Sequence, residues 1–281
     1  MSDLEFQGLG YRVDLEDVAN LRSHAQSIAP ITCGDIDPRE LGKPIGVKEW
    51  MFIENQARLN SCAGNSVTSI AEACIHYATN GQVTEQLSRM FAYINGQRHC
   101  GINGDSGSTL WGVLQGLKED GLPLESLAPY TGSYYTQFKA EAKADAKKRT
   151  LNSWIEVTNV NQVYEGLAKR IGGLYLGSCW TPNRSNLPSD NIVRRFQELR
   201  GYGFHATCIL DWCEEKDEQG NPLLREFNSH SKQYGDEGTA MWTRDALQQC
   251  IDAPNTTSYF ISDMTIVKPR FDYSKAKWTF V

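Results

Sequence analysis

The stretch NQARLNSCAGNSVTSIAEACIHY, residues 55–77, decides the fold, because it joins a polar segment to a long amphipathic pattern. A helix over residues 61–78 is indicated by apolar residues spaced three and four apart: Val67, Ile70, Ala71, Cys74, Tyr77 and Ala78. The pair Asn80-Gly81 is typical of a helix end. Cys62 is therefore expected in the first helical turn, where unpaired backbone N–H groups and the helix dipole favour negative charge. A thiol in such a position loses its proton more readily, and the thiolate is the nucleophilic form.

The composition is that of an ordinary globular protein that could form one large domain or two modest lobes. The chain has 281 residues, of which 40% are hydrophobic and 22% charged. Its net charge of −6 argues against a broad nucleic-acid-binding surface. No window approaches roughly 18 consecutive apolar residues, so we expect no membrane span, and the N-terminus lacks the pattern of a signal peptide. A solvated turn is the simplest interpretation of the acidic cluster Asp211, Glu214, Glu215 and Asp217.

The eight cysteines are scattered along the chain, and no two of them form a CxxC pair. This spacing argues against a structural zinc site, so we expect no bound metal. Together with the missing signal peptide, it predicts reduced thiols in the cytoplasm or another reducing compartment. Incorporation of the chain into a larger particle stays open.

The order of the predicted elements indicates an α+β protein with two lobes. Helical patterns dominate the first half, at residues 61–78, 84–96, 108–121, 139–149 and 161–170. Short apolar runs bounded by turn residues predict strands in the second half, at residues 172–180, 205–213, 222–229, 239–244 and 258–267. The expected domains are an N-terminal extension over 1–48 with a short helix near 14–28, a helical lobe over about 49–135, a β-rich lobe over about 136–270, and a tail over 271–281.

A thiolate nucleophile needs a base, and the base needs an orienting group. Among the five histidines, His205 is best placed, because it opens a strand after the glycine-rich turn RGYGF. His76 lies in the same predicted helix as Cys62, about 21 Å along its axis, and cannot reach the thiol. Asn228 ends another strand, where its amide could fix the tautomer of the imidazole. Taken singly, the cysteine and the histidine would each more often be structural residues.

Taken in order, Gln56, Cys62, His205 and Asn228 form a set that resembles the papain-like cysteine peptidases. The histidine follows the cysteine by 143 residues, a separation typical of that family. The segment NGDSGSTLWGVLQGLKEDGLPLESLAPY resembles the family segment that begins NGG. The register of the family motif NSWGxxWGxxG is matched by Asn228, Ser229, Gly235 and Gly238. The resemblance covers residues 44–267, most of the chain.

The resemblance implies a two-lobed fold, with a helical lobe, a β-barrel-like lobe and an active-site cleft between them. It implies a thiol protease that hydrolyses peptide bonds through an acyl-enzyme, with Cys62 as nucleophile, His205 as its partner and Asn228 as the orienting group. Gln56, six residues before the cysteine, would donate to the oxyanion. The substrate would be a peptide or protein, and no cofactor is implied. The expected substrate-binding positions are Asn103, Gly104, Asp105 and Phe204.

Several positions depart from the family pattern. Leu59 and Ile102 stand where the family has a disulfide pair, and Ala63 replaces the aromatic residue after the nucleophile. His230 replaces the tryptophan that shields the histidine–asparagine hydrogen bond, and Tyr234 replaces a second tryptophan. A polar ring at position 230 would admit water and weaken that shielding.

Two alternatives keep the fold but change the function. The same Cys-His chemistry serves hydrolases that act on cell-wall or isopeptide bonds, because function depends on the site rather than on the fold. The chain could also be a structural or binding component of a larger assembly, with weak or no activity. It would then contact a protein partner through the N-terminal extension or the C-terminal tail. The extension could also cover the cleft or complete the second lobe, although an extra packing element is a simpler interpretation than a cleft cover.

Overall fold

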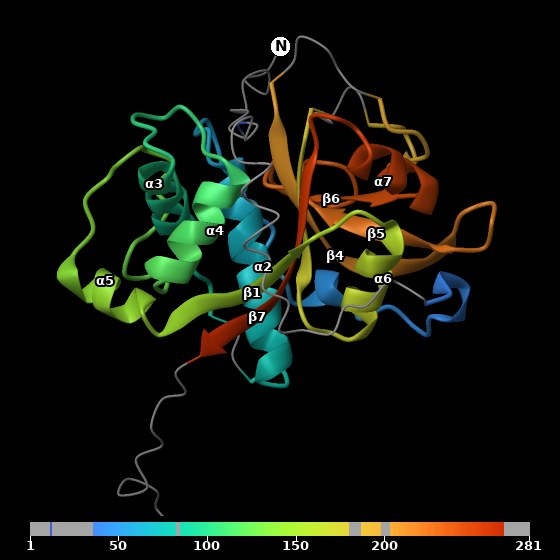
Figure 1. Cartoon of the computed structure of the whole chain (residues 1–281), viewed down its shortest axis with the longest axis horizontal. Helices are drawn as coiled ribbons and strands as arrows, with labels where there is room; N and C mark the ends of the chain where they lie inside the picture. The colour runs from blue at the N-terminus through green and yellow to red at the C-terminus, as the bar shows by residue number, and fades with distance from the viewer. Residues whose placement is uncertain (1–11, 13–35, 83–84, 180–186, 198–202, 267–281) are drawn as a thin grey trace, which may run out of the picture.

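The computed structural model describes residues 12, 36–82, 85–179, 187–197 and 203–266, which form two lobes around a central helix (Figure 1). The central helix is α2, Cys62–Ala78, which contacts both the other helices and the sheet. The helical lobe adds α3, Arg89–His99, α4, Leu110–Glu119, and α5, Ala140–Ala146. The predicted α+β class and two-lobed arrangement are confirmed. None of the helices in these ranges is long and apolar enough to cross a membrane.

The second lobe is built on a seven-stranded sheet in the order β1-β7-β2-β4-β5-β6-β3. The strands are β1, Arg149–Glu156; β2, Gly173–Ser178; β3, Ile192–Val193; β4, His205–Lys216; β5, Pro222–Phe227; β6, Thr239–Trp242; and β7, Thr257–Ile266. Neighbouring strands are antiparallel, except that β3 runs parallel to β6. The expected barrel-like closure is wrong for the described strands. The sheet is open because β3 pairs two residues with β6 alone, and β1 pairs only with β7 at the other edge.

Two helices cover the sheet of the second lobe, α6, Val160–Ala168, and α7, Arg244–Ile251. Their apolar faces form one core with the sheet: Val163, Leu167, Ala246, Leu247, Leu174, Ile209, Trp242 and Phe260. Gly166 permits the close approach of α6, since a Cβ at this position would lie 2.2 Å from the Phe260 ring. Two short 3-10 helices, η1, Pro38–Glu40, and η2, Val47–Glu49, precede α2 in the chain.

Most predicted elements are confirmed, and the errors are local. The predicted start of the second helix at residue 84 is wrong, because α3 begins after Ser88, whose Oγ accepts from Phe91 N at 3.1 Å. The strands β1 and β3 and the helix α7 were not expected as separate elements. The predicted helix near residues 14–28 and the tail over 271–281 lie outside the described residues.

Asp211 corrects the interpretation of the acidic cluster as a solvated turn. It lies within β4 and is 2% exposed. Its carboxylate accepts hydrogen bonds from the backbone N–H groups of Ile45, Gly46 and Val47, at 2.9, 2.9 and 2.8 Å. The carboxylate therefore fastens the chain that leads into η2 to the centre of the sheet, where its charge is satisfied by donors. The neighbouring Glu214 is exposed, as expected, but it too lies in β4 rather than in a turn.

Candidate active site

Cys62 is the first residue of α2 and is fully buried. The first turns of this helix are held against the sheet by two hydrogen bonds. Tyr175 Oη, on β2, donates to the carbonyl oxygen of Ala63 at 2.9 Å, and Ser66 Oγ donates to that of Ala206 at 2.9 Å. Because Ala206 follows His205 at the start of β4, these contacts bring the cysteine end of the helix to the strand end that carries the histidine.

His205 and Asn228 form a buried hydrogen-bonded pair. His205 Nε2 lies 2.9 Å from Asn228 Oδ1, and the two residues are 1% and 3% exposed. Since an amide oxygen only accepts, Nε2 carries the proton, which leaves Nδ1 as the acceptor. That nitrogen is buried without a hydrogen-bond partner in the described part of the chain. Burial lowers the pKa of His205 from 6.5 to about 4, although the Asn228 bond raises it.

His230 covers the His205–Asn228 pair, although a polar ring at this position was expected to admit water. Its ring stacks on the His205 ring, with centroids 4.5 Å apart and planes inclined by 29°. The Tyr234 ring meets His230 edge-on at 6.1 Å. His230 is only 5% exposed, and burial together with the nearby His205 holds its pKa well below 6.5. A neutral, buried imidazole thus occupies the shielding position.

Gln56 is fully buried and is tied to the loop that follows Asn228. Ser229 Oγ donates to Gln56 Oε1 at 2.5 Å, and Gln56 N donates to the carbonyl oxygen of Ser229 at 2.8 Å. Gln56 Nε2 donates to the Leu59 carbonyl oxygen at 2.9 Å. These bonds fix which way the amide faces, and a primary amide carries two N–H donors. The sequence singled out Gln56 but not the role of Ser229 in orienting it.

The expected substrate-binding wall is joined to the segment that precedes Cys62. Asp105 Oδ1 accepts from Asn60 N and from Tyr93 Oη, both at 2.8 Å. Asn60 Nδ2 in turn donates to the Asp105 carbonyl oxygen at 2.8 Å. The carboxylate thus has a structural role in holding the wall beside residue 60. Asn103 and Gly104 are exposed, so a ligand can reach them.

Phe204 is half-buried and packs against the core cluster that contains Cys62 and Ala206. A direct role in substrate binding stays a prediction for Phe204 and for the three wall residues.

Arg12 contacts the segment that directly follows this wall, although it comes from the predicted N-terminal extension. Its backbone N–H donates to the Ser108 carbonyl oxygen at 3.0 Å, and its Nε donates to that of Ser106 at 2.7 Å. Residues 36–48 instead approach the sheet through Asp211. The rest of the extension lies outside the described residues.

The seven cysteines in the described ranges are all free thiols. Leu59, at the position of the absent disulfide, is 6% exposed and packs with Met90, Tyr93 and Ile94. Leu59 thus packs on α3, the helix that precedes Ile102 in the chain. In the same ranges, no three His, Cys, Asp or Glu side chains gather as metal ligands.

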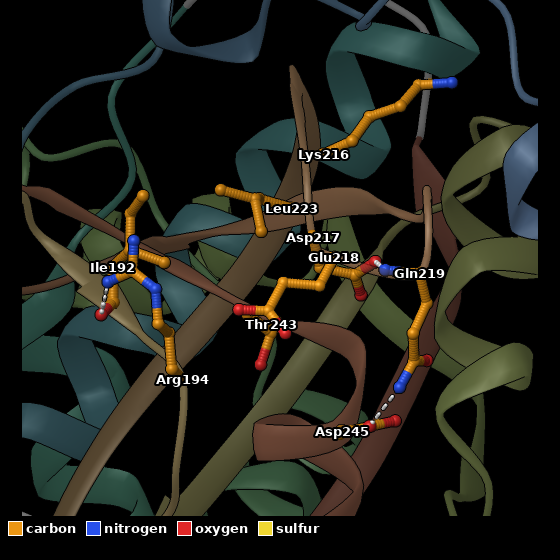
Figure 2. A pocket seen from close by; sticks show the side chains of 9 residues that line it. All are labelled: Ile192, Arg194, Lys216, Asp217, Glu218, Gln219, Leu223, Thr243 and Asp245. Carbon is orange, nitrogen blue, oxygen red and sulfur yellow. Dashed lines mark hydrogen bonds between the residues drawn. The ribbon is translucent and has the colours of Figure 1, made fainter.

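A separate surface pocket lies on the β-rich lobe (Figure 2). Its volume is ≈ 290 Å³, and its lining includes Arg194, Lys216, Asp217 and Asp245. Gln219 Nε2 donates to Asp245 Oδ2 across it at 2.7 Å. None of the predicted site residues lines this pocket, so it is distinct from the candidate active site.

Comparisons with known proteins identify the fold. No protein-family model matches the chain, and no curated protein matches it. Among solved structures, xylellain, a cysteine protease from Xylella fastidiosa, is 17% identical with a TM-score of 0.71, over 93% of this chain and 98% of that one. Digestive procathepsin L 3 of Tenebrio molitor larval midgut is 16% identical with a TM-score of 0.63, over 83% and 73% of the two chains. Bromelain protease from Ananas comosus, in complex with the E64 inhibitor, is 13% identical with a TM-score of 0.60, over 79% and 99%. The chain therefore has the fold of the papain-like cysteine proteases, in a divergent form.

Proposed function

We propose that this protein is a cysteine peptidase that uses Cys62, His205 and Asn228 as its catalytic triad. The observation that carries the proposal is the buried bond from His205 Nε2 to Asn228 Oδ1. It leaves Nδ1 as a proton acceptor at the strand end against which the first turns of α2 pack. A nucleophile, a base and a group that orients the base are the parts that acyl transfer requires.

The proposed reaction begins when His205 Nδ1 takes the proton of the Cys62 thiol. The sulfur then attacks the carbonyl carbon of the scissile bond, and the carbonyl π electrons move to the oxygen. The backbone N–H of Cys62 and the amide of Gln56 donate to this oxyanion, each with a contribution of about 3 kcal/mol. As the C–N bond breaks, His205 returns the proton to the leaving amine, and water then hydrolyses the thioester through the same base.

The proposal is tested by an irreversible epoxide inhibitor of thiol proteases, followed by mass spectrometry of all the cysteines. We expect modification of Cys62 at least about 100-fold faster than that of an unactivated thiol, because the triad supplies its thiolate. His205→Ala is expected to abolish this advantage. His99→Ala is the matched control, since His99 is the last residue of α3, its Nε2 lies 3.0 Å from Asp120 Oδ2, and it plays no part in the proposed site. Labelling of Cys62 no faster than that of a free thiol would instead favour a binding component with a papain-like fold.

The charge state of His205 gives a second prediction. Because burial lowers the pKa of His205 to about 4, its imidazolium needs a negative charge beside it, and the proposed source is the Cys62 thiolate. In Cys62→Ala the ring should therefore stay neutral as the pH falls from 8 and become protonated only near pH 4. In the unmodified protein it should become protonated at a higher pH. Histidine ring resonances followed by NMR across this range measure both midpoints, and equal midpoints would contradict the thiolate–imidazolium pair.

The class of bond that the enzyme hydrolyses is set by the substrate-binding residues, because the same triad can act on several kinds of amide bond. We propose peptide bonds, because an extended peptide could lie along the exposed residues Asn103 and Gly104. Comparison of a peptide, an isopeptide-linked and a cell-wall amide substrate distinguishes the three classes. Preference for either of the latter two would retain the triad but reject the peptidase assignment.

A further inference from the structure

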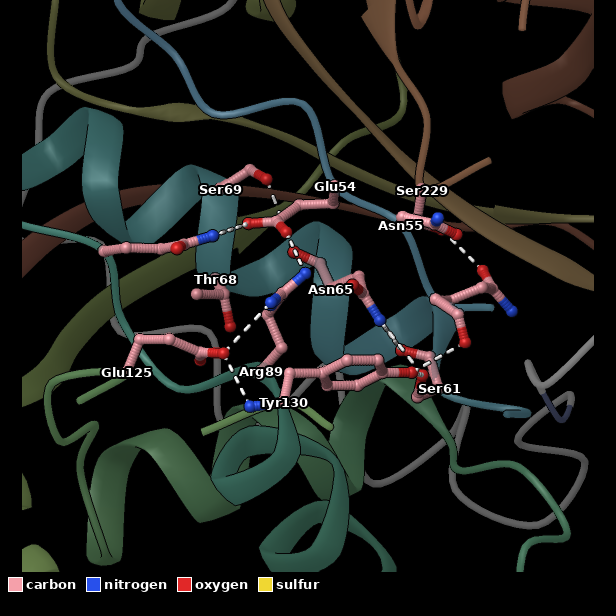
Figure 3. Close-up of polar contacts among 12 residues, drawn as sticks. Glu54, Asn55, Ser61, Asn65, Thr68, Ser69, Arg89, Glu125, Tyr130 and Ser229 are labelled. Atoms are coloured by element: carbon pink, nitrogen blue, oxygen red, sulfur yellow. Dashed lines mark hydrogen bonds and ion pairs between the residues drawn. The ribbon is translucent and has the colours of Figure 1, made fainter. Parts of the chain in front are cut away.

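A run of hydrogen bonds joins Asn65, Ser61 and Tyr130 (Figure 3). It continues from Tyr130 to the backbone of Gln56. Asn65 Nδ2 lies 3.0 Å from Ser61 Oγ and 2.9 Å from the Ser61 carbonyl oxygen. Ser61 Oγ lies 2.6 Å from Tyr130 Oη, and Tyr130 Oη lies 2.8 Å from the Gln56 carbonyl oxygen. Ser61 directly precedes Cys62, so this run connects the segments that carry both expected oxyanion donors.

The donor and the acceptor in each of these bonds are determined by the groups at the two ends of the run, an amide NH2 that donates and a carbonyl oxygen that accepts. A carbonyl oxygen only accepts, so the Tyr130 hydroxyl donates its single hydrogen bond to the Gln56 carbonyl oxygen. The Tyr130 oxygen must then accept from Ser61, whose own oxygen accepts from Asn65. The second N–H of Asn65 is used by the Ser61 carbonyl oxygen, which fixes the orientation of the amide. Each hydroxyl in the run therefore has one possible role.

This arrangement keeps the Ser61 hydroxyl away from the end of α2. Serine at an N-cap normally accepts from a backbone N–H of the first turn, in an extended conformation. Ser61 is the N-cap of α2 but makes no such bond, and its φ of −108° and ψ of 17° are not extended. The hydroxyl thus does not compete with an oxyanion for the first-turn N–H groups.

Tyr130 is itself held by a buried ion cluster. The Arg89 guanidinium lies 4.5 Å from the centre of its ring, and the Tyr130 N–H donates to Glu125 Oε1 at 2.6 Å. Arg89 bridges Glu125, at 3.0 Å, and Glu54, two residues before Gln56 (Figure 3). The ring, the backbone N–H and the hydroxyl of Tyr130 are therefore each held by a contact, and the hydroxyl has little freedom to move.

We propose that Tyr130 is a positioning residue of the oxyanion site. Its hydroxyl holds the Gln56 backbone and the Ser61 side chain at once, and this sets the separation between the Gln56 amide and the Cys62 N–H. The inference rests on the proposed peptidase function and adds to it a residue that lies far from the triad in the sequence.

Tyr130→Phe tests the inference, because it removes the hydroxyl and keeps the ring. We expect kcat for a peptide substrate to fall about 10-fold with KM changed less than about twofold, since small displacements of oxyanion donors act on the transition state. Affinity for a peptide aldehyde should fall by a similar factor, because its adduct with the thiol places an oxygen between the donors. The rate of alkylation by iodoacetamide should change less than about threefold, because that displacement forms no oxyanion.

Tyr135→Phe is the matched control, since Tyr135 Oη also donates to a backbone carbonyl oxygen in this segment, that of Pro129, at 2.8 Å. It should leave all three measurements unchanged. Unchanged kcat in Tyr130→Phe would overturn the inference. It would also be overturned if kcat and the alkylation rate fell equally and the protein were less stable in urea, because that result indicates a merely structural role. Absence of hydrolysis and of selective labelling in the unmodified protein would reject the proposed function itself. This outcome is measured without any variant, so it is distinguishable from a failure of the inference about Tyr130.

Discussion

Replacing Cys62 with alanine is expected to lower kcat for peptide hydrolysis by a factor of about 10⁴ or more, because no other group can form the thioester. The residue is fully buried at the first turn of α2, so the substitution removes one sulfur and leaves the helix in place. Binding of substrate should change little, since the sulfur contributes to bond formation rather than to affinity. Initial rates over a range of peptide concentrations separate the two effects.

Cys74→Ala provides the control, because it deletes another buried thiol from the same helix. Cys74 lies near the C-terminal end of α2, remote from its first turn, and its Sγ lies 3.5 Å from the Ile171 carbonyl oxygen. Burial raises the pKa of Cys74 to about 12, so it carries almost no thiolate at neutral pH. The control should lose some stability but keep its kcat. A Cys62→Ala protein that retains more than about 1% of the kcat would rule out covalent catalysis by this residue.

The central helix and the pairing of His205 with Asn228 were predictable because they depend on local signals. The 3.6-residue periodicity after Cys62 is strong, and the helix begins and ends close to where the pattern predicts. His205 and Asn228 were predicted at the ends of separate strands. In the structure β4 begins at His205, Asn228 directly follows β5, and these two strands are neighbours in the sheet. Adjacent strands bring their ends together whatever the intervening loop contains.

Features that depend on distant contacts were not predictable. The pattern RDALQQCI follows a capping threonine, Thr243, and could have indicated α7, but its apolar positions are few. Tyr130 carries no local sign of its bond to Gln56, because 74 residues separate them. Asp211 was grouped with exposed acids, since charge in a short run usually indicates solvent. Its donors come from a segment 164 to 166 residues away.

Replacing Asp211 with alanine is therefore expected to lower the free energy of unfolding by about 4 kcal/mol, the second large effect that the structure predicts. The carboxylate accepts from Ile45, Gly46 and Val47, and also from Trp212 N at 2.8 Å. Hydrogen bonds to a buried charged group are stronger than neutral ones, and their loss leaves backbone donors without acceptors. Urea unfolding measures the change directly.

Glu214→Ala is the control for Asp211→Ala, because it removes an exposed acid three residues further along β4 and should change stability by less than about 0.5 kcal/mol. The loss of stability in Asp211→Asn should fall between those two values. The amide keeps one acceptor oxygen, but its NH2 group faces backbone N–H groups that are donors themselves. If the carboxylate fastens the chain before α2, limited proteolysis of Asp211→Ala should cut first within residues 36–48, before the sheet unfolds. Loss of less than about 1 kcal/mol, with that segment still protected, would mean that packing around Trp212 and η2 holds it without the charge.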